Sequence, residues 1–311
     1  MNIAVIGSSG MIGSAVARAL VDRGDRVLGI VRTVAGGTRP WTERTWDPST
    51  AAGPPGIVDD CDAVVNLAGA PIAQRWSDRA WSEIVASRVT ATEHIAAAVV
   101  GAGVRTFVNA SAVGYYGSSE QPVDERAPVG AGPLAELCAA WEGATEPATN
   151  TARVVLLRTG VVLARDGGAL AKMLTPAKLG LGGPIGDGRQ WFPWVHIDDA
   201  VGLILWAVDG QVAGPLNLVA PGIVRQRDFA STLGDVLGRP ARLPTPTIAL
   251  RAMLGRGASV VTEGQHVVPR VAIDGGYAFA FPDLPAALHD LLDWLPLVGH
   301  REQLLQLRPD D

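Results

Sequence analysis

The chain has 311 residues, of which 48% are hydrophobic and 18% charged, as in globular rather than disordered proteins. Its net charge of −5 argues against a general nucleic-acid-binding surface. Two cysteines, Cys61 and Cys138, form no disulfide framework and lack metal-ligand spacing. No apolar run is long enough for a membrane span, and no basic segment precedes the apolar N-terminus. We therefore expect a cytoplasmic protein without a metal, nucleic-acid or membrane partner.

The first thirteen residues carry the clearest functional pattern. An apolar run ends in three glycines spaced G-x-x-G-x-x-G, and an alanine-rich helical pattern follows. Glycines allow a sharp turn, let a pyrophosphate approach the main chain and let the helix pack closely on the strand. The helix N-terminus adds amide N–H groups and partial positive charge. A dinucleotide site is therefore predicted at Gly7, Ser8, Ser9, Gly10, Met11, Ile12 and Gly13.

Three later segments are expected to complete this site. Arg32 follows a strand predicted over 27–31, where an acidic residue would bind the ribose hydroxyls of NAD and an arginine can bind the 2′-phosphate of NADP. The sequence therefore favours NADP(H) over NAD(H). Asp47 precedes a proline and is interpreted equally as an adenine contact or as a turn residue. Small residues after the strand predicted at 62–70 are expected to let the backbone approach the cofactor: Leu67, Ala68 and Gly69.

Strands and helices alternate over the first part of the chain. Further strands are predicted over 44–46, 105–111, 154–159 and 215–219, and helices over 11–23, 78–100 and 200–209. After residue 160 the alternation weakens, with a glycine-rich stretch at 164–193, a strand at 277–281, and helices at 227–237, up to 254 and at 286–295. This pattern predicts an α/β fold, a Rossmann-like doubly wound parallel sheet with a smaller C-terminal substrate lobe. Residues 1–160 form the core, to which 195–220 return, and residues 161–194 and 221–311 form the lobe.

Several charged and aromatic residues are candidate contacts for an anionic substrate. Arg75 precedes the helix predicted over 78–100, and Arg88 interrupts its surface; each either meets an anionic ligand or is solvated or salt-bridged. In or beside the glycine-rich stretch the candidates are Lys178, Arg189 and Trp191, with a flexible surface lid as the alternative. Asp198 is expected to cap the helix predicted over 200–209, and His196 to be a hydrogen-bonded structural residue.

The order of these motifs resembles the extended short-chain dehydrogenase/reductases of the NAD-dependent epimerase/dehydratase type. The resemblance rests on the glycine turn, Asn66 to Gly69, the Ser111 loop with Tyr116-Gly117, and Val195 to Asp199. Residues 111–117, 157–163, 182–191 and 264–269 are similar to an atypical subgroup with a short C-terminal domain of unknown function, here about 258–306. The resemblance implies an NADP(H)-binding oxidoreductase or epimerase-like enzyme acting on a small carbonyl or hydroxyl substrate. Monomer and homodimer both stay open.

The catalytic pattern departs from that family, whose members use a Ser or Thr with Tyr-x-x-x-Lys. Leu134 stands where the tyrosine belongs and Cys138 where the lysine belongs, and no Tyr-x-x-x-Lys occurs in the sequence. Three alternatives remain for the site. In the first, Ser111 forms a different proton-transfer pair with Tyr115 or Tyr116; Ser111 also matches a cofactor-contacting position of the family. In the second, Glu136, Cys138 or Glu142 acts from the following helix. In the third, that helix face is only part of the hydrophobic core. The alternative to an enzyme is a non-catalytic NADP(H)-binding regulatory or scaffold protein.

Overall fold

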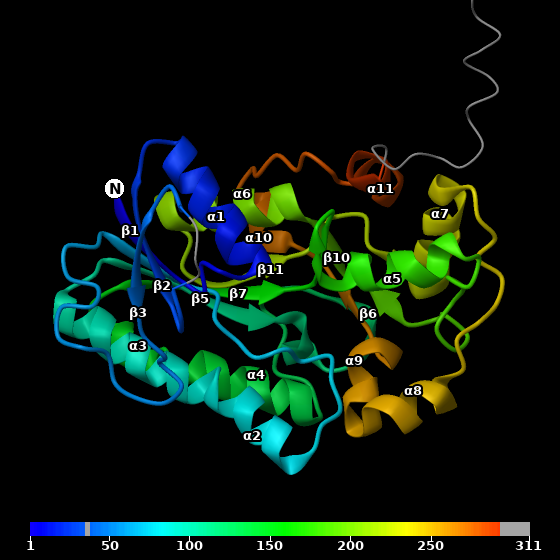
Figure 1. The fold of residues 1–311 in the computed structure, drawn as a ribbon, viewed down its shortest axis with the longest axis horizontal. Coiled ribbons are helices and arrows are strands. Elements are labelled where there is room, and N and C mark those ends of the chain that lie inside the picture. The colour runs from blue at the N-terminus through cyan, green and yellow to red at the C-terminus, as the bar shows by residue number, and fades with distance from the viewer. Residues whose placement is uncertain (35–37, 293–311) are drawn as a thin grey trace, which may run out of the picture.

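The structure, a computed structural model, describes residues 1–34 and 38–292, and its centre is a seven-stranded parallel sheet (Figure 1). The strand order is β11-β7-β5-β4-β1-β2-β3. The strands are β1 (Asn2–Ile6), β2 (Arg26–Val31), β3 (Thr42–Thr45), β4 (Ala63–Asn66), β5 (Thr106–Ala112), β7 (Arg153–Thr159) and β11 (Gly214–Leu218). The predicted α/β class and doubly wound parallel sheet are confirmed.

The order in which strands are added to the sheet reverses at β1. Strands β2 and β3 extend the sheet to one edge, whereas β4, β5, β7 and β11 extend it to the other. Ile6, the last residue of β1, pairs with Ile30 of β2 on one side and with Asn66 of β4 on the other. Open α/β sheets bind their ligands at the carboxyl ends of the strands where the strand order reverses. The sheet topology therefore directs attention to the loops that follow β1, β2 and β4.

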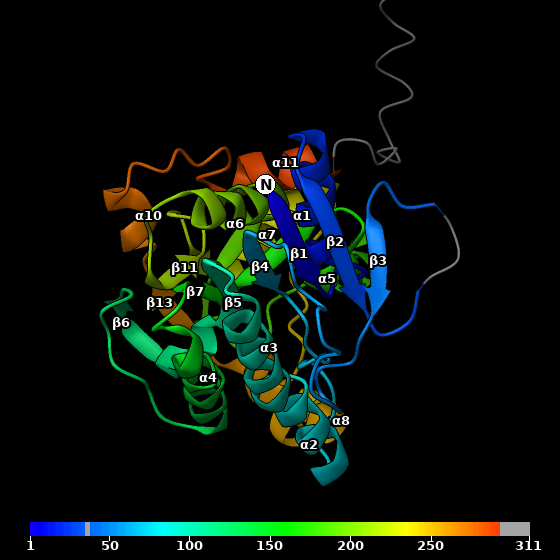
Figure 2. The ribbon, with the colours of Figure 1, turned by 90° about the vertical axis from the view of Figure 1, so that its left-hand side faces the viewer.

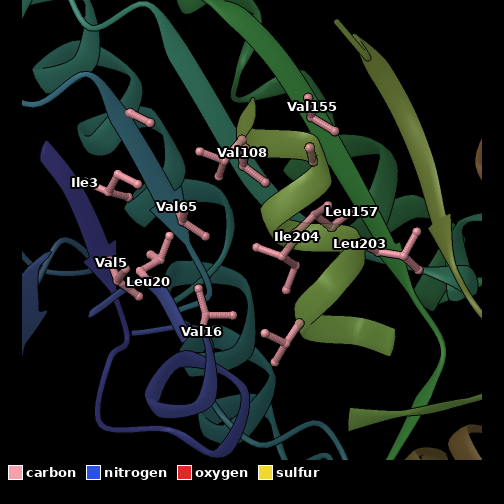
Figure 3. Packing of buried hydrophobic residues seen from close by; sticks show 14 of the residues in the cluster. Ile3, Val5, Val16, Leu20, Val65, Val108, Val155, Leu157, Leu203 and Ile204 are labelled. Atoms are coloured by element: carbon pink, nitrogen blue, oxygen red, sulfur yellow. The ribbon is translucent and has the colours of Figure 1, made fainter. Parts of the chain in front are cut away.

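Helices cover both faces of the sheet (Figures 1 and 2). Because strand side chains alternate between faces, Ile3 and Val5 of β1 pack in the cluster drawn in Figure 3, whereas Ala4 and Ile6 pack on the opposite face. This two-sided burial explains the continuous apolar run of β1. One face carries α1 (Met11–Asp22), α6 (Ile197–Asp209) and α10 (Arg270–Asp274), and the other carries α2 (Asp78–Ala86), α3 (Val89–Ala102) and α4 (Pro133–Gly143).

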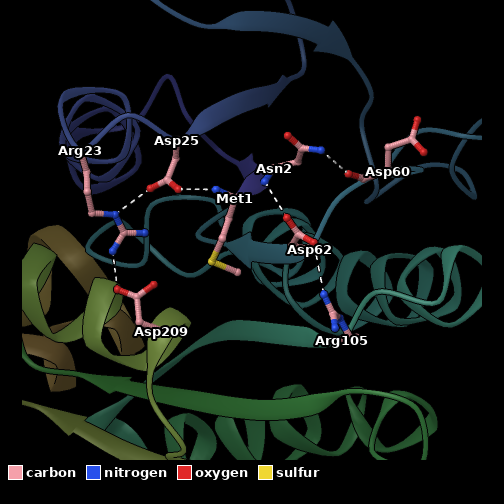
Figure 4. Close-up of polar contacts among 8 residues, drawn as sticks. All are labelled: Met1, Asn2, Arg23, Asp25, Asp60, Asp62, Arg105 and Asp209. Atoms are coloured by element: carbon pink, nitrogen blue, oxygen red, sulfur yellow. Dashed lines mark hydrogen bonds and ion pairs between the residues drawn. The ribbon is translucent and has the colours of Figure 1, made fainter.

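Polar contacts hold the amino ends of the strands together (Figure 4). The amino nitrogen of Met1 lies 2.7 Å from Asp25 Oδ1, and Arg23 contacts both Asp25 and Asp209 at the end of α6. The N–H of Asn2 donates to Asp62, just before β4, at 2.8 Å. These contacts join β1, α1, α6 and β4 at the end of the sheet opposite the glycine turn.

The remaining elements lie mostly to the right of the central sheet in Figure 1. They are β6 (Ser119–Val123), β8 (Val161–Ala164), α5 (Gly168–Lys178), β9 (Trp191–Phe192), β10 (Trp194–His196), β12 (Val224–Arg225), α7 (Gln226–Leu237), α8 (Thr247–Leu254), α9 (Ser259–Thr262), β13 (Gln265–Val267) and α11 (Leu284–Leu292), with short 3₁₀ turns η1 (Val113–Tyr116), η2 (Glu146–Ala148) and η3 (Gly255–Ala258). Strand β13 pairs with β6, and β10 pairs with β8. The predicted division into core and lobe stays a prediction.

The helix predicted over 78–100 is two helices, α2 and α3, because local hydrogen bonds interrupt it at Ser87 and Arg88. Ser87 Oγ donates to the carbonyl of Ile84 and accepts the N–H of Ala70 at 3.0 Å. Arg88 donates to the carbonyls of Ile84 and Ala70. Side-chain bonds of this kind compete with continuous helical bonding. The break therefore docks the loop that follows β4 against the start of α3.

Two predictions at the N-terminus of α6 are wrong. His196 caps this helix, because its Nδ1 accepts the N–H of Asp198, and Asp198 lies in the first turn instead. Residues 277–281 form no strand, because the Asp199 carboxylate accepts the N–H groups of Ala280 and Phe281 that a neighbouring strand would have paired. His196 is buried and hydrogen-bonded, as expected.

The glycine-rich stretch and the C-terminal end also differ in part from the expectation. Helix α5 occupies part of the glycine-rich stretch at 164–193, for which no helix was predicted. Helix α11 agrees with the helix predicted from 286, but the predicted end at 293–295 lies outside the described residues. Residues 293–306 of the predicted terminal domain also lie outside them.

Replacing Gly13 by alanine tests the close packing of α1 on the glycine turn. A Cβ at Gly13 would lie 2.2 Å from the carbonyl oxygen of Gly7, so backbone must move. We expect Gly13→Ala to lower the free energy of unfolding by about 1–3 kcal/mol. The matched control is Gly101→Ala on α3, where a Cβ meets nothing within 4 Å and alanine gains up to about 1 kcal/mol. Chemical denaturation measures both, and equal stabilities would contradict the packing constraint.

Candidate functional site

A cleft of about 180 Å³ lies at the carboxyl ends of β1, β2 and β4. The sheet topology selects the same position, because the strand order reverses there. Ser87, at the end of α2, and Ala91, in the first turn of α3, close one side of the cleft. The residues predicted to bind a cofactor that line it are Gly7, Ser9, Gly10, Arg32, Asp47, Leu67, Ala68 and Gly69.

The glycine turn shapes the floor of this cleft by bringing backbones together. Gly7 has a φ of +85°, which favours glycine, and a Cβ there would lie 3.0 Å from the backbone nitrogen of Ala68. The turn is closed by the N–H of Gly10, which donates to the carbonyl of Gly7 at 3.0 Å. Gly10 is the N-cap of α1 and supplies no side chain to bond the first amides of the helix. Those amides suit an anionic ligand.

The other predicted residues of the turn do not line the cleft with their side chains. Ser8 is fully buried, and its hydroxyl has no hydrogen-bond partner among the described residues. It lies under the turn, next to Gly29 of β2. Met11 packs against the start of α5, since its sulfur lies 3.0 Å from where a Cβ of Gly168 would be. Ile12 is partly buried in two apolar clusters, and Gly13 is buried against the turn.

Two predicted residues lie on the rim of the cleft at its β2 side. Arg32 is exposed, follows β2 directly and has no carboxylate within ion-pair distance among residues 1–34 and 38–292. Asp47 Oδ1 accepts both the N–H of Ser49 at 3.0 Å and its hydroxyl at 2.6 Å. Asp47 therefore forms the predicted turn and also lines the cleft, so the adenine contact stays a prediction.

The second cluster of interest is a buried polar network built around Arg158. Ser111 of β5 donates to Glu142 Oε1 at 2.6 Å, and Arg158 of β7 bonds both oxygens of Glu142 at 2.9 and 2.8 Å. All three side chains are less than a tenth exposed. Burial by itself would lower the pKa of Arg158, but hydrogen bonds to Glu142 and Tyr116 raise that pKa above its ordinary value. Arg158 therefore stays charged and holds Glu142 against Ser111.

The network continues from Arg158 to the last strand of the sheet. Arg158 donates to the hydroxyl of Tyr116 at 3.1 Å, and this hydroxyl donates to Asn217 of β11 at 2.7 Å. Burial raises the pKa of Tyr116 to about 12. The N–H of Asn217 in turn donates to the buried carboxyl of Glu125 at 3.1 Å. The ring of Tyr115 lies 3.5 Å from the Arg158 guanidinium carbon. Neither Ser111 nor Tyr116 lines the cleft.

Helix α4 presents apolar groups where the related enzymes carry Tyr and Lys. A Cβ at Gly114 would lie 3.4 Å from Leu134 and 3.7 Å from the sulfur of Cys138, so both side chains pack on the loop after β5. Burial, together with the charge of Glu142, raises the pKa of Cys138 to about 12. Cys138 is therefore a neutral thiol at physiological pH. Of the two glutamates on this helix, Glu136 is exposed and only Glu142 joins Ser111.

The residues predicted to bind substrate do not form one cluster. Arg75 donates to the carbonyl of Ala252 in α8 at 2.9 Å, and Lys178 is exposed at the end of α5. Arg189 is also exposed, and its carbonyl accepts a hydrogen bond from Arg225.

The ring of Trp191 is covered on both sides. It stacks on His266 with 4.0 Å between ring centroids, and the Arg225 guanidinium carbon lies 3.8 Å from the ring centroid. None of the four predicted substrate residues lines the cleft. Their role in substrate binding stays a prediction.

Sequence reasoning missed the roles of Arg158, Glu125 and Asn217. Arg158 had a detectable signal, since it is a charged residue inside an otherwise apolar strand and charged residues are rarely fully buried without a partner. Glu125 and Asn217 had none, because their contacts join segments 92 residues apart in the chain.

A parallel doubly wound sheet with a glycine turn at its reversal point defines a dinucleotide-binding α/β protein. The chain belongs to the NAD dependent epimerase/dehydratase family, whose sequence pattern matches residues 3–218. Residues 245–291 match a domain of unknown function, DUF1731.

Relatives cover three quarters or more of the chain. The epimerase family protein ML0860 of Mycobacterium leprae is 42% identical over 291 residues, covering 92% of this chain and 94% of its own. The SDR39U1 homolog of Arabidopsis thaliana, a chloroplastic protein, is 44% identical over 241 residues, covering 76% and 70%. The crystal structure of human SDR39U1 (isoform 2) with NADPH superposes with a TM-score of 0.86 at 38% identity, covering 95% of this chain and all of the human one.

The predicted cytoplasmic location stays a prediction, since the Arabidopsis relative is chloroplastic. None of the helices within the described residues is long and apolar enough to cross a membrane.

Removing the Arg158 guanidinium tests the buried network. Arg158→Met leaves Glu142 charged and unpaired, so we expect a loss of about 3–5 kcal/mol in the free energy of unfolding. Adding Glu142→Leu to this variant removes the unpaired charge and recovers part of the loss. The control Arg105→Met breaks only an exposed pair with Asp62 and changes stability by less than about 1 kcal/mol. Denaturant titrations compare the three variants. If Arg158→Met is as stable as the Arg105→Met control, the buried network does not stabilise the fold.

Proposed function

We propose that the cleft binds NADP(H). The main support for NADP(H) is that an exposed arginine, and not a carboxylate, follows β2 at the rim of the cleft formed by the glycine turn. An acidic residue at that place would bond the 2′-hydroxyl of NAD and repel a 2′-phosphate, whereas Arg32 attracts it. A Cβ at Gly7 would obstruct the backbone floor, which fits a pyrophosphate lying close to the main chain. The human relative crystallised with NADPH supports the same cofactor.

Replacing Arg32 tests this cofactor preference. Arg32→Ala should weaken NADPH binding about tenfold, because a charge-assisted contact to the 2′-phosphate is lost, and leave NADH binding within about twofold. Arg18→Ala, which removes an exposed arginine from α1, is the matched control for the change in net charge. Calorimetric titration gives both affinities for each protein. Tighter binding of NADH than NADPH by the unaltered chain rejects the role of Arg32.

The reaction proposed is hydride transfer to or from a small carbonyl or hydroxyl compound, as an oxidoreductase or an epimerase-like enzyme. Membership of the epimerase/dehydratase family supports it. The bound cofactor supplies the hydride chemistry, and the protein supplies orientation and proton transfer. In this proposal a substrate hydroxyl gives its proton to Ser111 Oγ while Ser111 passes its own proton to Glu142 Oε1 along their hydrogen bond, in which the two oxygens lie 2.6 Å apart; the reverse occurs in reduction. Arg158 positions Glu142 for this exchange.

A panel of carbonyl and alcohol substrates, followed by NADPH absorbance, tests this reaction. Unaltered protein should turn over at least one substrate, and Ser111→Ala or Glu142→Gln should lower kcat about 100-fold or more, as loss of general acid–base catalysis does. Their NADPH affinity should stay within about twofold. Glu136→Gln, an exposed change on the same helix, should leave kcat unaltered. Unchanged turnover in Ser111→Ala removes its catalytic role.

A second candidate function is a non-catalytic NADP(H)-binding regulator or scaffold. It is favoured by the apolar groups at Leu134 and Cys138 and by the pKa of Tyr116, which burial raises to about 12. Tight NADPH binding without turnover of any substrate in the panel, together with a co-purifying partner, would support this function over catalysis. The choice between monomer and homodimer stays a prediction, and gel filtration with light scattering decides it.

A further inference from the structure

Arg88 caps the start of α3 and lies behind the loop that follows β4, which lines the cleft. Its guanidinium donates to the carbonyl of Ala70 at 3.0 Å, and a Cβ at Gly69 would lie 3.4 Å from its central carbon. Gly69 and Ala70 line the cleft, as do Ser87 and Ala91 on either side of Arg88. The guanidinium therefore lies directly against the loop that follows β4.

The charge of Arg88 is not neutralised by a carboxylate. Among residues 1–34 and 38–292 no acidic group lies within ion-pair distance of it. Its other neighbour is α4, where the ring centroid of Trp141 lies 5.1 Å from the guanidinium carbon. Burial lowers the pKa of Arg88. Arg88 is half-buried, and a partly desolvated cation without a counter-charge is stabilised by a ligand that offers oxygen atoms.

Some N–H donors of Arg88 have no acceptor among the described residues. A guanidinium has five N–H groups. Three hydrogen bonds use them, to the carbonyls of Ile84 and Ala70 and to Ser87 Oγ. Two donors therefore have no acceptor among the described residues. A ligand that offers oxygen atoms at the β4 side of the cleft would satisfy them.

The sheet order places Arg88 and Arg32 on opposite sides of the glycine turn. β1 lies between β2 and β4, Arg32 follows β2, and Arg88 contacts the loop after β4. A dinucleotide whose 2′-phosphate lies at Arg32 and whose pyrophosphate lies at the turn therefore extends its second nucleoside toward Arg88.

We propose that Arg88 binds the ribose hydroxyls of the nicotinamide half of NADP(H), an inference that rests on the proposed cofactor. The cation comes from α3, whereas α4 presents Cys138 where related enzymes have a lysine. Arg88 is thus a cofactor-binding residue supplied from a different helix.

Two ligands separate the halves of the cleft. NADPH contains both nucleosides, whereas adenosine 2′,5′-bisphosphate ends before the nicotinamide half. Arg88→Met should weaken NADPH binding about 10- to 100-fold, the range of a charge-assisted contact, and leave adenosine 2′,5′-bisphosphate binding within about twofold. Arg88→Lys should keep most of the NADPH affinity. Arg79→Met, an exposed change on α2 with the same loss of charge, should alter neither affinity.

Calorimetric titration of the full chain gives these affinities, and thermal unfolding shows whether each variant is folded. If Arg88→Met does not fold, Arg88→Gln keeps an amide donor for Ala70 and removes the charge, and the same pattern is expected. Equal weakening of both ligands, or no weakening of NADPH, overturns the proposal. If the unaltered chain binds neither ligand, the proposed cofactor is also overturned. This outcome distinguishes failure of the proposed cofactor from failure of the role proposed for Arg88.

Discussion

The buried pair of Arg158 and Glu142 is the interaction on which the centre of the molecule depends. Two charges removed from water are tolerated only when every hydrogen bond is made, and here Arg158 also bonds Tyr116 while Glu142 also bonds Ser111. The pair therefore connects β5, β7, α4 and, through Asn217, β11. The orientation of Ser111 at the carboxyl end of β5 follows from this connection.

The cleft is built by a different kind of constraint. Its floor consists of backbone atoms that approach closely because Gly7 and Gly13 have no Cβ. Its walls are Arg32 directly after β2, residues 46–49 after β3 and residues 67–70 after β4. Two cations lie at its margins: Arg32 directly follows β2, and Arg88 lies behind the β4 loop. Backbone geometry thus shapes a site of the kind that binds dinucleotides, and the selectivity proposed for it depends on the two arginines.

Much of the fold was predictable because the signals are local. The continuous apolar run of β1 follows from burial on both faces of a parallel sheet, and the glycine spacing follows from a steric limit within thirteen residues. The strand predicted at 277–281 was wrong for the opposite reason: the Asp199 carboxylate, some eighty residues earlier, takes its backbone N–H groups. Alternating aromatic residues therefore marked packing and not a strand.

The amino-acid sequence by itself determined the glycine-turn cleft, the place of Arg32 directly after the second strand and the absence of a Tyr-x-x-x-Lys relay, since each depends on neighbouring residues and the order of elements. Only the tertiary structure decided that Glu142, not Glu136, meets Ser111, and that Arg88 lies against the wall of the cleft. These contacts join separate strands and helices, whose side chains meet only when the sheet and its helices have packed.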